Sequence, residues 1–145
     1  MSRFVRPVVD VLRLANGDTV TVRRRLNTGE ERAMYRRMST VNGDGGLTID
    51  DLAVGPAKVT AYLLDWTLTD DDGQPVMIRD LSLEELARVV DNLDPDDFRE
   101  IRDAIDGHID RQAAARAEEK KVRSGETPSS VTLPSPVAAA GPSTG

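Results

Sequence analysis

The segment from Leu81 to Lys121 limits the possible folds most strongly, because it carries two consecutive helix starts. Ser82 and Glu85 have the spacing of a capping box, in which each side chain accepts a hydrogen bond from the other residue's backbone N–H. Asp94 and Pro95 combine an N-cap residue with a proline at the first helical position. The segment therefore predicts two helices in succession.

Each of these helices has an apolar stripe of helical periodicity. The stripe of the first helix contains Leu83, Leu86, Ala87, Val90 and Leu93, and that of the second contains Phe98, Ile101, Ile105 and Ile109. We expect the two stripes to form a local core. His108, the only histidine, lies near the second stripe, and we expect it to be partly packed there.

The N-terminal part predicts a β-hairpin followed by a helix. Residues 8–14 and 19–23 are rich in β-branched residues, and Asn16-Gly17 between them is typical of a tight hairpin turn. Thr28 and Glu31 fit another capping box, which predicts a helix over residues 30–38. We expect Met34, Tyr35 and Met38 to share one side of that helix.

The middle of the chain is ambiguous, because residues 59–68 fit both a helical face and a strand. The turn signal Asp72-Gly73 follows them. We favour a helix to about Leu64 and then a short hairpin from Trp66 to Ile78.

The predicted fold class is α+β, with an N-terminal β-hairpin, a mostly helical remainder and a C-terminal helical pair. We expect an N-terminal arm over residues 1–7 and a single domain over residues 8–121. Residues 122–145 consist largely of Ser, Pro, Ala, Thr and Gly and contain no aromatic residue. Such a segment buries too little apolar surface to offset its ordering entropy, so we expect a disordered tail.

Charge and composition exclude several classes of function. The net charge of −6 argues against nonspecific binding to nucleic acid or to an anionic membrane. The absence of cysteine excludes disulfides and thiolate metal sites. No stretch is apolar enough to span a bilayer and no signal peptide is recognisable, so we expect residence in the cytoplasm.

The glycine-rich stretch over residues 40–52 resembles a calcium loop of the EF-hand or dockerin type. Asn42, Asp44 and Asp51 fall at the third, fifth and twelfth positions of such a loop. Thr40 stands where the first carboxylate is expected, which removes a charge and a direct ligand. We therefore favour a polar connector and no metal, and retain these three residues as weak calcium candidates.

No other arrangement of residues suits catalysis. A single histidine does not form a zinc site or a catalytic triad, and no phosphate-binding glycine-rich loop with a lysine occurs. We expect no enzymatic activity and no cofactor. The remaining charged feature is a basic cluster, which either docks an acidic partner or pairs with the chain's own acidic helices: Arg23, Arg24, Arg25, Arg32, Arg36 and Arg37.

Taken together, these segments resemble the tail assembly chaperones of long-tailed (siphovirus-type) bacteriophages, in their short form. The resemblance covers residues 8–121. It includes the N-terminal hairpin, the block from Lys58 to Leu68, the Asp-Asp-Gly-Gln-Pro-Val turn, the Leu93–Phe98 helix start and the Ala/Glu/Lys-rich end of the last helix.

The resemblance implies a protein that binds the tape measure protein and helps recruit tail tube subunits during virion morphogenesis. Proteins of this family act in the host cytoplasm, are generally absent from the mature virion and have no catalytic residues. A homo-oligomer is possible, and no nucleic acid or membrane is expected as a partner. We assign partner binding to three arginines and three large apolar residues: Arg24, Arg36, Arg37, Trp66, Leu86 and Phe98.

Three alternatives remain open at this point, one of which is a small nucleic-acid-binding regulator that would bind RNA through the basic cluster. A structural virion protein, such as a head–tail connector or a minor tail protein, would have a similar size and acidity. A calcium-dependent interaction module of the dockerin or EF-hand type would use the stretch over residues 40–52.

Overall fold

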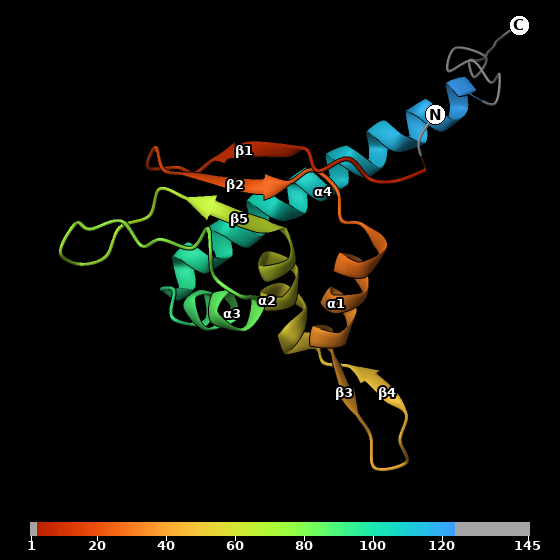
Figure 1. The fold of residues 1–145 in the computed structure, drawn as a ribbon, viewed down its shortest axis with the longest axis horizontal. Coiled ribbons are helices and arrows are strands. Elements are labelled where there is room, and N and C mark those ends of the chain that lie inside the picture. Colours follow the sequence, from red (N-terminus) through yellow and green to blue (C-terminus); the bar gives the residue numbers. More distant parts are fainter. Residues whose placement is uncertain (1–2, 124–145) are drawn as a thin grey trace, which may run out of the picture. The chain divides into compact units, whose positions relative to one another are not determined.

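The computed structural model describes residues 3–123. It confirms the α+β class. The described elements are β1 (Val9–Arg13), β2 (Thr19–Arg23), α1 (Thr28–Met38), β3 (Ser39–Val41), β4 (Leu47–Ile49), α2 (Asp51–Tyr62), β5 (Leu63–Trp66), α3 (Leu83–Asp91) and α4 (Pro95–Arg123) (Figure 1).

The chain divides into two compact units inside α4, after Ile109. All packing described below belongs to the first unit. In the second unit the described residues continue α4 to Arg123, so the first two residues of the predicted tail, Val122 and Arg123, are helical. The rest of that predicted tail, residues 124–145, lies outside the described residues, as do the first two residues of the predicted arm.

The N-terminal hairpin forms as the sequence predicts. β1 and β2 pair antiparallel, and Gly17 in the turn between them has a φ of 92°, which a residue with a Cβ rarely adopts. β2 places Val20 and Val22 on its buried face. The alternation of β-branched residues therefore covers one side of the core.

The prediction for residues 63–78 is wrong for the first four residues and right in part for the rest. The helix ends at Tyr62 and residues 63–66 form β5, which pairs antiparallel with β2 and completes the sheet order β1-β2-β5. This pairing satisfies the second edge of β2 and buries Leu63 and Trp66. The predicted turn at Asp72-Gly73 does form, with backbone hydrogen bonds from the Asp70 N–H to the Gln74 carbonyl and from the Val76 N–H to the Leu68 carbonyl on either side of an isolated bridge.

One apolar core joins the sheet to α3 and α4. Ile101 and Ile105 of α4 are completely buried and pack in the same cluster as Val20, Leu63 and Trp66. Leu86 and Val90 of α3 complete this core, as the helical stripes predict. Leu83 departs from its predicted place in the stripe, because it is largely exposed at the start of α3.

Helix α2 runs close to α4 at Gly55. A Cβ at this position would lie 3.3 Å from Arg102 Cδ and 3.4 Å from the ring of Phe98. The glycine therefore lets the Phe98 ring rest on the backbone of α2. A smaller cluster holds α1 against the other side of α2 and contains Leu26, Met34, Met38, Ala57 and Ala61.

The predicted capping boxes are confirmed at Ser82, with Glu85, and displaced by one residue at α1. The N-cap of α1 is Asn27, whose side chain accepts from the Glu30 N–H, and Glu30 accepts in return from the Asn27 N–H. Met34 and Met38 are buried as predicted, whereas Tyr35, predicted beside them, is 51% exposed, because it lies about 100° around the helix from Met34. Asp94 caps α4 as predicted, accepting from the Asp96 N–H at 2.8 Å.

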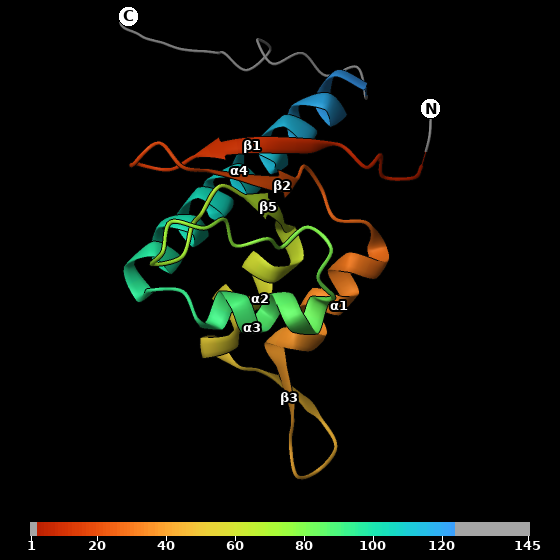
Figure 2. The ribbon, with the colours of Figure 1, turned by 60° about the vertical axis from the view of Figure 1, so that its left-hand side comes forward.

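A second hairpin, β3–β4, occupies the stretch that resembles a calcium loop. It follows α1 directly and leads into α2. Both views show it extending away from the helices (Figures 1 and 2). The polar connector expected here is confirmed for residues 42–46, which form the turn, whereas the two short strands that flank it were not predicted.

Candidate functional site

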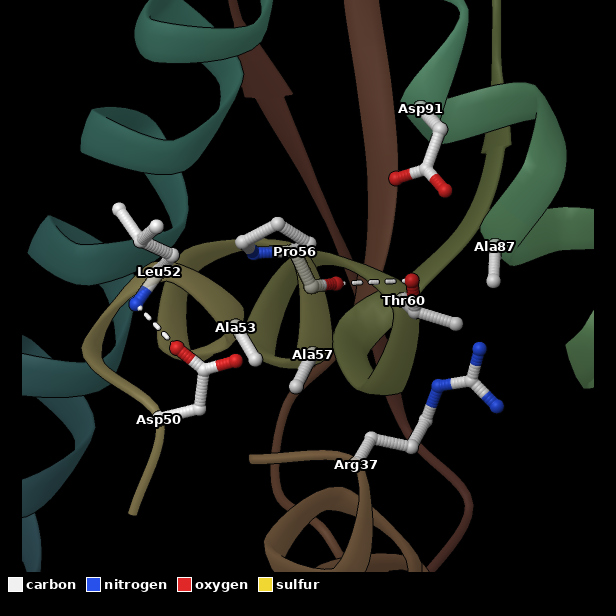
Figure 3. Close-up of a pocket in the computed structure, with 9 residues that line it drawn as sticks. All are labelled: Arg37, Asp50, Leu52, Ala53, Pro56, Ala57, Thr60, Ala87 and Asp91. Carbon is white, nitrogen blue, oxygen red and sulfur yellow. Dashed lines mark hydrogen bonds between the residues drawn. The ribbon is translucent and has the colours of Figure 1, made fainter. Parts of the chain in front are cut away.

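A groove lies over α2, between α1 and α3. Its wider part has a volume of about 390 Å³ and contains Arg37, Asp50, Leu52, Ala53, Pro56, Ala57, Thr60, Ala87 and Asp91 (Figure 3). An adjoining hollow of about 270 Å³ shares Arg37 and Thr60 with it and extends along Met34 to Leu83. The two hollows form one groove whose floor is α2.

The floor of the groove is made of small side chains. Ala53, Pro56, Ala57, Thr60 and Ala61 line it along α2. The hydroxyl of Thr60 donates to the carbonyl oxygen of Pro56 at 2.8 Å, so this polar group is satisfied within the helix (Figure 3). The floor therefore presents a shallow, mostly apolar surface that needs no polar partner.

Both positively and negatively charged side chains line the groove. Arg37 of α1 reaches across to α3, where its Nη1 lies 2.8 Å from Oε1 of Glu84. Asp50 and Asp91 are both among the lining residues of the wider hollow. The Asp50 side chain also caps α2, accepting from the Leu52 N–H at 3.0 Å. The groove thus combines an apolar floor with polar walls.

Leu52 stands at the edge of the groove with 88% of its surface exposed. Leu83 lies at the other hollow and is also exposed. Large apolar side chains left in water beside an apolar groove are typical of protein interaction sites. Sequence reasoning missed both positions, because it assigned Leu83 to the core and did not single out Leu52.

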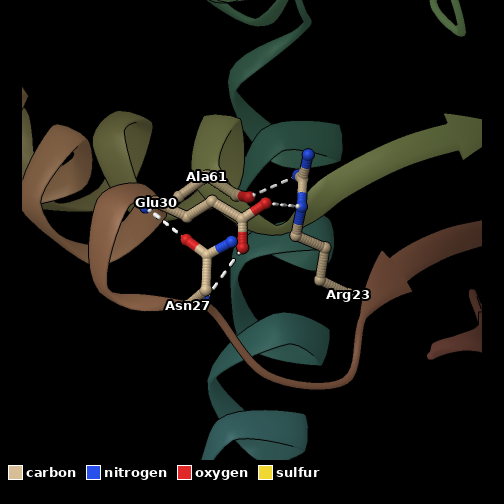
Figure 4. A network of polar contacts seen from close by, with 4 residues as sticks. All are labelled: Arg23, Asn27, Glu30 and Ala61. Carbon is tan, nitrogen blue, oxygen red and sulfur yellow. Dashed lines mark hydrogen bonds and ion pairs between the residues drawn. The ribbon is translucent and has the colours of Figure 1, made fainter. Parts of the chain in front are cut away.

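A polar network fixes the first residues of α1 (Figure 4). The Glu30 carboxylate completes the cap at Asn27 and also pairs with Arg23, whose Nε lies 2.8 Å from Oε2. The Nη1 of Arg23 donates to the carbonyl oxygen of Ala61 at 2.8 Å. Arg23 therefore joins β2, α1 and the end of α2.

The predicted basic cluster is divided among several pairings. Arg24 binds Asp10 with two hydrogen bonds, Nε to Oδ2 at 3.0 Å and Nη2 to Oδ1 at 2.8 Å. The hydrogen bond from Arg24 holds the pKa of Asp10 below its usual value, and Asp10 in turn raises the pKa of Arg24. Arg37 pairs with Glu84, whereas no ion pair of Arg36 occurs within residues 3–123. All three assigned arginines are charged, but within the described residues Arg24 and Arg37 already pair with carboxylates of this chain.

The three apolar residues assigned to partner binding lie apart from the groove. Trp66 is buried in the core, and its Nε1–H donates to the carbonyl oxygen of Val76 at 2.7 Å. Leu86 is buried in the same core, and Phe98 is half-buried against Gly55. Trp66 and Leu86 are therefore core residues and are not exposed to a partner.

The weak calcium candidates lie along the β3–β4 hairpin. Asn42 accepts from the Thr48 hydroxyl at 2.8 Å, and Asp44 accepts from the Gly46 N–H at 3.0 Å, both near the tip. Asp51 is the first residue of α2, beyond the base of the hairpin. With about 3.3 Å per strand residue, the hairpin separates Asp51 from the other two by its own length. Within residues 3–123, no group of three or more His, Cys, Asp or Glu side chains is placed to hold a metal ion.

His108 is buried, more completely than the sequence predicted. Its Nε2 lies 3.0 Å from the carbonyl oxygen of Arg23, which identifies this nitrogen as the donor. Its ring meets Tyr62 edge-on, with the ring centroids 6.2 Å apart. The histidine therefore ties α4 to the end of β2.

No described helix combines the length and apolar character that crossing a bilayer requires. No family model matches this sequence, and neither the curated proteins nor the solved structures include one that is significantly similar to it.

Proposed function

We propose that this protein is a tail assembly chaperone of a long-tailed bacteriophage, which holds a helical segment of the tape measure protein in the groove over α2. In this role it helps to recruit tail tube subunits during virion morphogenesis, acts in the host cytoplasm and is absent from the mature virion. The sequence resemblance over residues 8–121 supports the family. The groove supports the mode of binding.

The single observation that carries the proposal is the small-residue floor between two separated helices. The side chains of Ala53 and Ala57 are single methyl groups, so a second helix can approach the axis of α2 closely. From Leu52 to Ala61 the floor extends for roughly 14 Å at 1.5 Å per residue, which matches two to three turns of a bound helix once the ion pair between Arg37 and Glu84 across the groove has opened. A helix laid in an apolar groove is a common mode of peptide recognition.

The rim residues indicate what such a helix would present. The exposed Leu52 and Leu83 would contact apolar side chains of the ligand at the two hollows. Arg36 is exposed on α1 outside the residues that line the two hollows, and would attract acidic residues of the ligand that extend beyond the groove. A ligand helix with an apolar stripe and acidic flanks therefore fits this site.

A binding measurement with charge-matched variants tests the proposal. Leu52→Glu places a charge at the rim of the groove, whereas Val11→Glu places the same charge on an exposed residue of β1, outside the groove. With the tape measure protein of the same phage as ligand, we expect Leu52→Glu to weaken binding at least tenfold, while Val11→Glu changes it less than threefold. Ala87→Arg, which fills the groove from α3, should have the same effect as Leu52→Glu.

Equal binding by all variants would exclude the groove as the site. Failure of the unmodified protein to bind the tape measure protein at all would exclude the proposed function. Mass spectrometry of purified particles gives an independent test, because a chaperone should be missing from them. Stoichiometric amounts in the particle would instead identify a structural virion protein.

A further inference from the structure

The β3–β4 hairpin exposes an apolar face that nothing in the described structure covers. Val41 is paired with Leu47, and Ser39 with Ile49, so these residues share one face, while Thr40 and Thr48 form a pair on the other. Val41 is 71% exposed, Leu47 73% and Ile49 50%. A two-stranded hairpin is only marginally stable in water, so it gains stability by acquiring further strands.

The hydrogen bonds within the hairpin show which backbone groups remain available. The Asn42 N–H donates to the Gly46 carbonyl and the Asp50 N–H to the Met38 carbonyl, each at 2.7 Å. Bonded pairs alternate along an antiparallel ladder, so the next bonded pair is Thr40 with Thr48. The N–H and C=O groups of Leu47 and Ile49 therefore point outward, along the free edge of β4.

This edge lacks charges, prolines and bulges, three of the features that normally prevent strand pairing, and its shortness is the one such feature that it has. β1, the exposed edge of the larger sheet, is preceded by Pro7 and ends at the charged Arg13. β4 has neither a proline nor a charged residue, since its sequence is Leu-Thr-Ile. Natural proteins blunt exposed edges with charges, prolines or bulges, and an edge without them is a template for another strand.

We propose that β4 pairs antiparallel with β4 of a second copy of this chain, about a two-fold axis at Thr48. In this register Leu47 lies opposite Ile49 of the second copy, and the outward backbone groups of both residues are satisfied. The product is a four-stranded sheet in the order β3-β4-β4-β3. Its apolar face joins Val41, Leu47 and Ile49 of both copies into one continuous patch.

A second copy fits this edge because the pairing is self-complementary. The two-fold arrangement gives every apolar side chain of β4 an apolar neighbour and brings no charge onto the strands. The strand is only three residues long, whereas a stable dimer buries about 800 Å² per partner. The contact is therefore weak, with a dissociation constant on the order of 10–100 µM.

The net charge adds a distinctive salt dependence. Each copy carries a net charge of −6, so two copies repel one another over the distance of a Debye length. Salt screens this repulsion without weakening apolar or backbone contacts. Dimerisation through β4 therefore strengthens as salt is raised, whereas a contact made by ion pairs weakens.

Disulfide trapping provides the sharpest test, because the chain contains no cysteine. In the proposed ladder the two Thr48 residues form the non-hydrogen-bonded pair at the axis, with Cα atoms about 4.5 Å apart, which is within the range for a disulfide. Thr48→Cys should form a covalent dimer under mild oxidation in the full chain. Thr40→Cys is the matched control, since Thr40 is the exposed cross-strand neighbour of Thr48 on the far strand.

We expect the Thr48→Cys dimer to accumulate at least tenfold faster than that of Thr40→Cys, and faster still at high salt. Equal rates for the two variants, or no dimer from Thr48→Cys, would overturn the proposal. Circular dichroism on both variants confirms that the exposed substitutions leave the fold intact.

Sedimentation of the unmodified chain tests the contact without cysteine. We expect the unmodified chain to pass from monomer to dimer as its concentration is raised from about 1 to about 500 µM, because the interface is small. Ile49→Pro removes the outward N–H of β4 and should weaken the dimer at least tenfold. Val41→Pro removes the outward N–H of β3 and should change it less than threefold.

A monomer throughout this range, or equal loss in the two proline variants, would refute pairing through β4. None of these measurements involves the tape measure protein. Their outcome is therefore independent of the proposed chaperone function.

Discussion

β2, the central strand of the sheet β1-β2-β5, and β4, in the hairpin β3–β4, are built from similar residues. Both alternate threonine with Val, Leu or Ile, and both hairpins have a glycine with positive φ in the turn. In the larger sheet Val20 and Val22 are completely buried under α4, whereas every residue of β4 is exposed. The difference shows that cover by a helix, and not strand sequence, separates a structural strand from one available to a partner.

The largest expected contrast is between two isoleucines. Ile105→Ala removes a completely buried side chain from the core and should destabilise the protein by about 2–5 kcal/mol. Ile49→Ala acts on the half-exposed face of the hairpin and should cost under about 1 kcal/mol in dilute monomer. Urea denaturation at low protein concentration measures both. Similar losses would mean that the hairpin belongs to the cooperative core.

A change of polarity at constant shape sharpens the same comparison. Val22→Thr places a hydroxyl in the buried face of β2, where leaving it without a partner costs about 1–3 kcal/mol. Val41→Thr places it in water and should have almost no effect on the free energy of unfolding. Thermal melts of the two variants suffice, and a large loss from Val41→Thr would show that this face is covered in solution.

The turn glycines separate global from local stability. Gly17 and Gly45 have φ values of 92° and 87°, and an alanine at either position is strained by roughly 1–2 kcal/mol. Gly17→Ala should lower global stability by that amount, because the β1–β2 turn belongs to the core sheet. Gly45→Ala should mainly increase opening of the β3–β4 hairpin. Hydrogen exchange at the hairpin amides, measured beside global unfolding, detects the difference.

The smallest effect concerns the ion pair at the larger sheet. The pKa of Asp10 is lowered chiefly by its hydrogen bond from Arg24, so the folded protein releases this proton more readily than the unfolded chain does. The resulting stability is complete above the ordinary pKa of 3.8 and is lost as the pH falls through the lower folded value.

Asp10→Asn should therefore cost under about 1 kcal/mol at neutral pH, the scale of an exposed ion pair. Its stability curve should approach that of the unmodified protein in acid, below the lowered pKa of Asp10, where this carboxyl is protonated in both the folded and the unfolded state. Denaturation of both proteins across this pH range measures the effect. If the difference in their free energies of unfolding persists unchanged in acid, the substitution acts through packing and not through the ion pair.

Local signals predicted the elements whose stability is mainly local. The hairpin turn at Asn16-Gly17 and the caps at Ser82 and Asp94 depend on residues within a few positions of one another. The cap of α1 was placed one residue late, because Asn27-Thr28-Gly29-Glu30-Glu31 offers two overlapping boxes. Only the packing of Met34 and Met38 against α2 distinguishes them.

The candidate site was predicted poorly, for a physical reason. A groove depends on the distance between α1 and α3, which no local pattern encodes. The small residues of α2 were visible in the sequence but were read as an ambiguous apolar run. The β3–β4 strands had a usable signal, since Thr40-Val41 and Leu47-Thr48-Ile49 flank a glycine-rich turn. Because residues 40–52 resemble a calcium loop, they were interpreted as a connector and the two strands were not predicted.

By itself the sequence determined α1, α3 and α4, the caps at Ser82 and Asp94, the N-terminal hairpin and most of the apolar stripes, because each rests on periodicity and on hydrogen bonds between near neighbours. Only the tertiary structure decided that residues 63–66 join β2, that Trp66 and Leu86 are buried, and that Leu52 and β4 stay exposed. Those outcomes depend on which distant surfaces meet. Contacts between residues far apart in the chain are settled by the packing of the whole core.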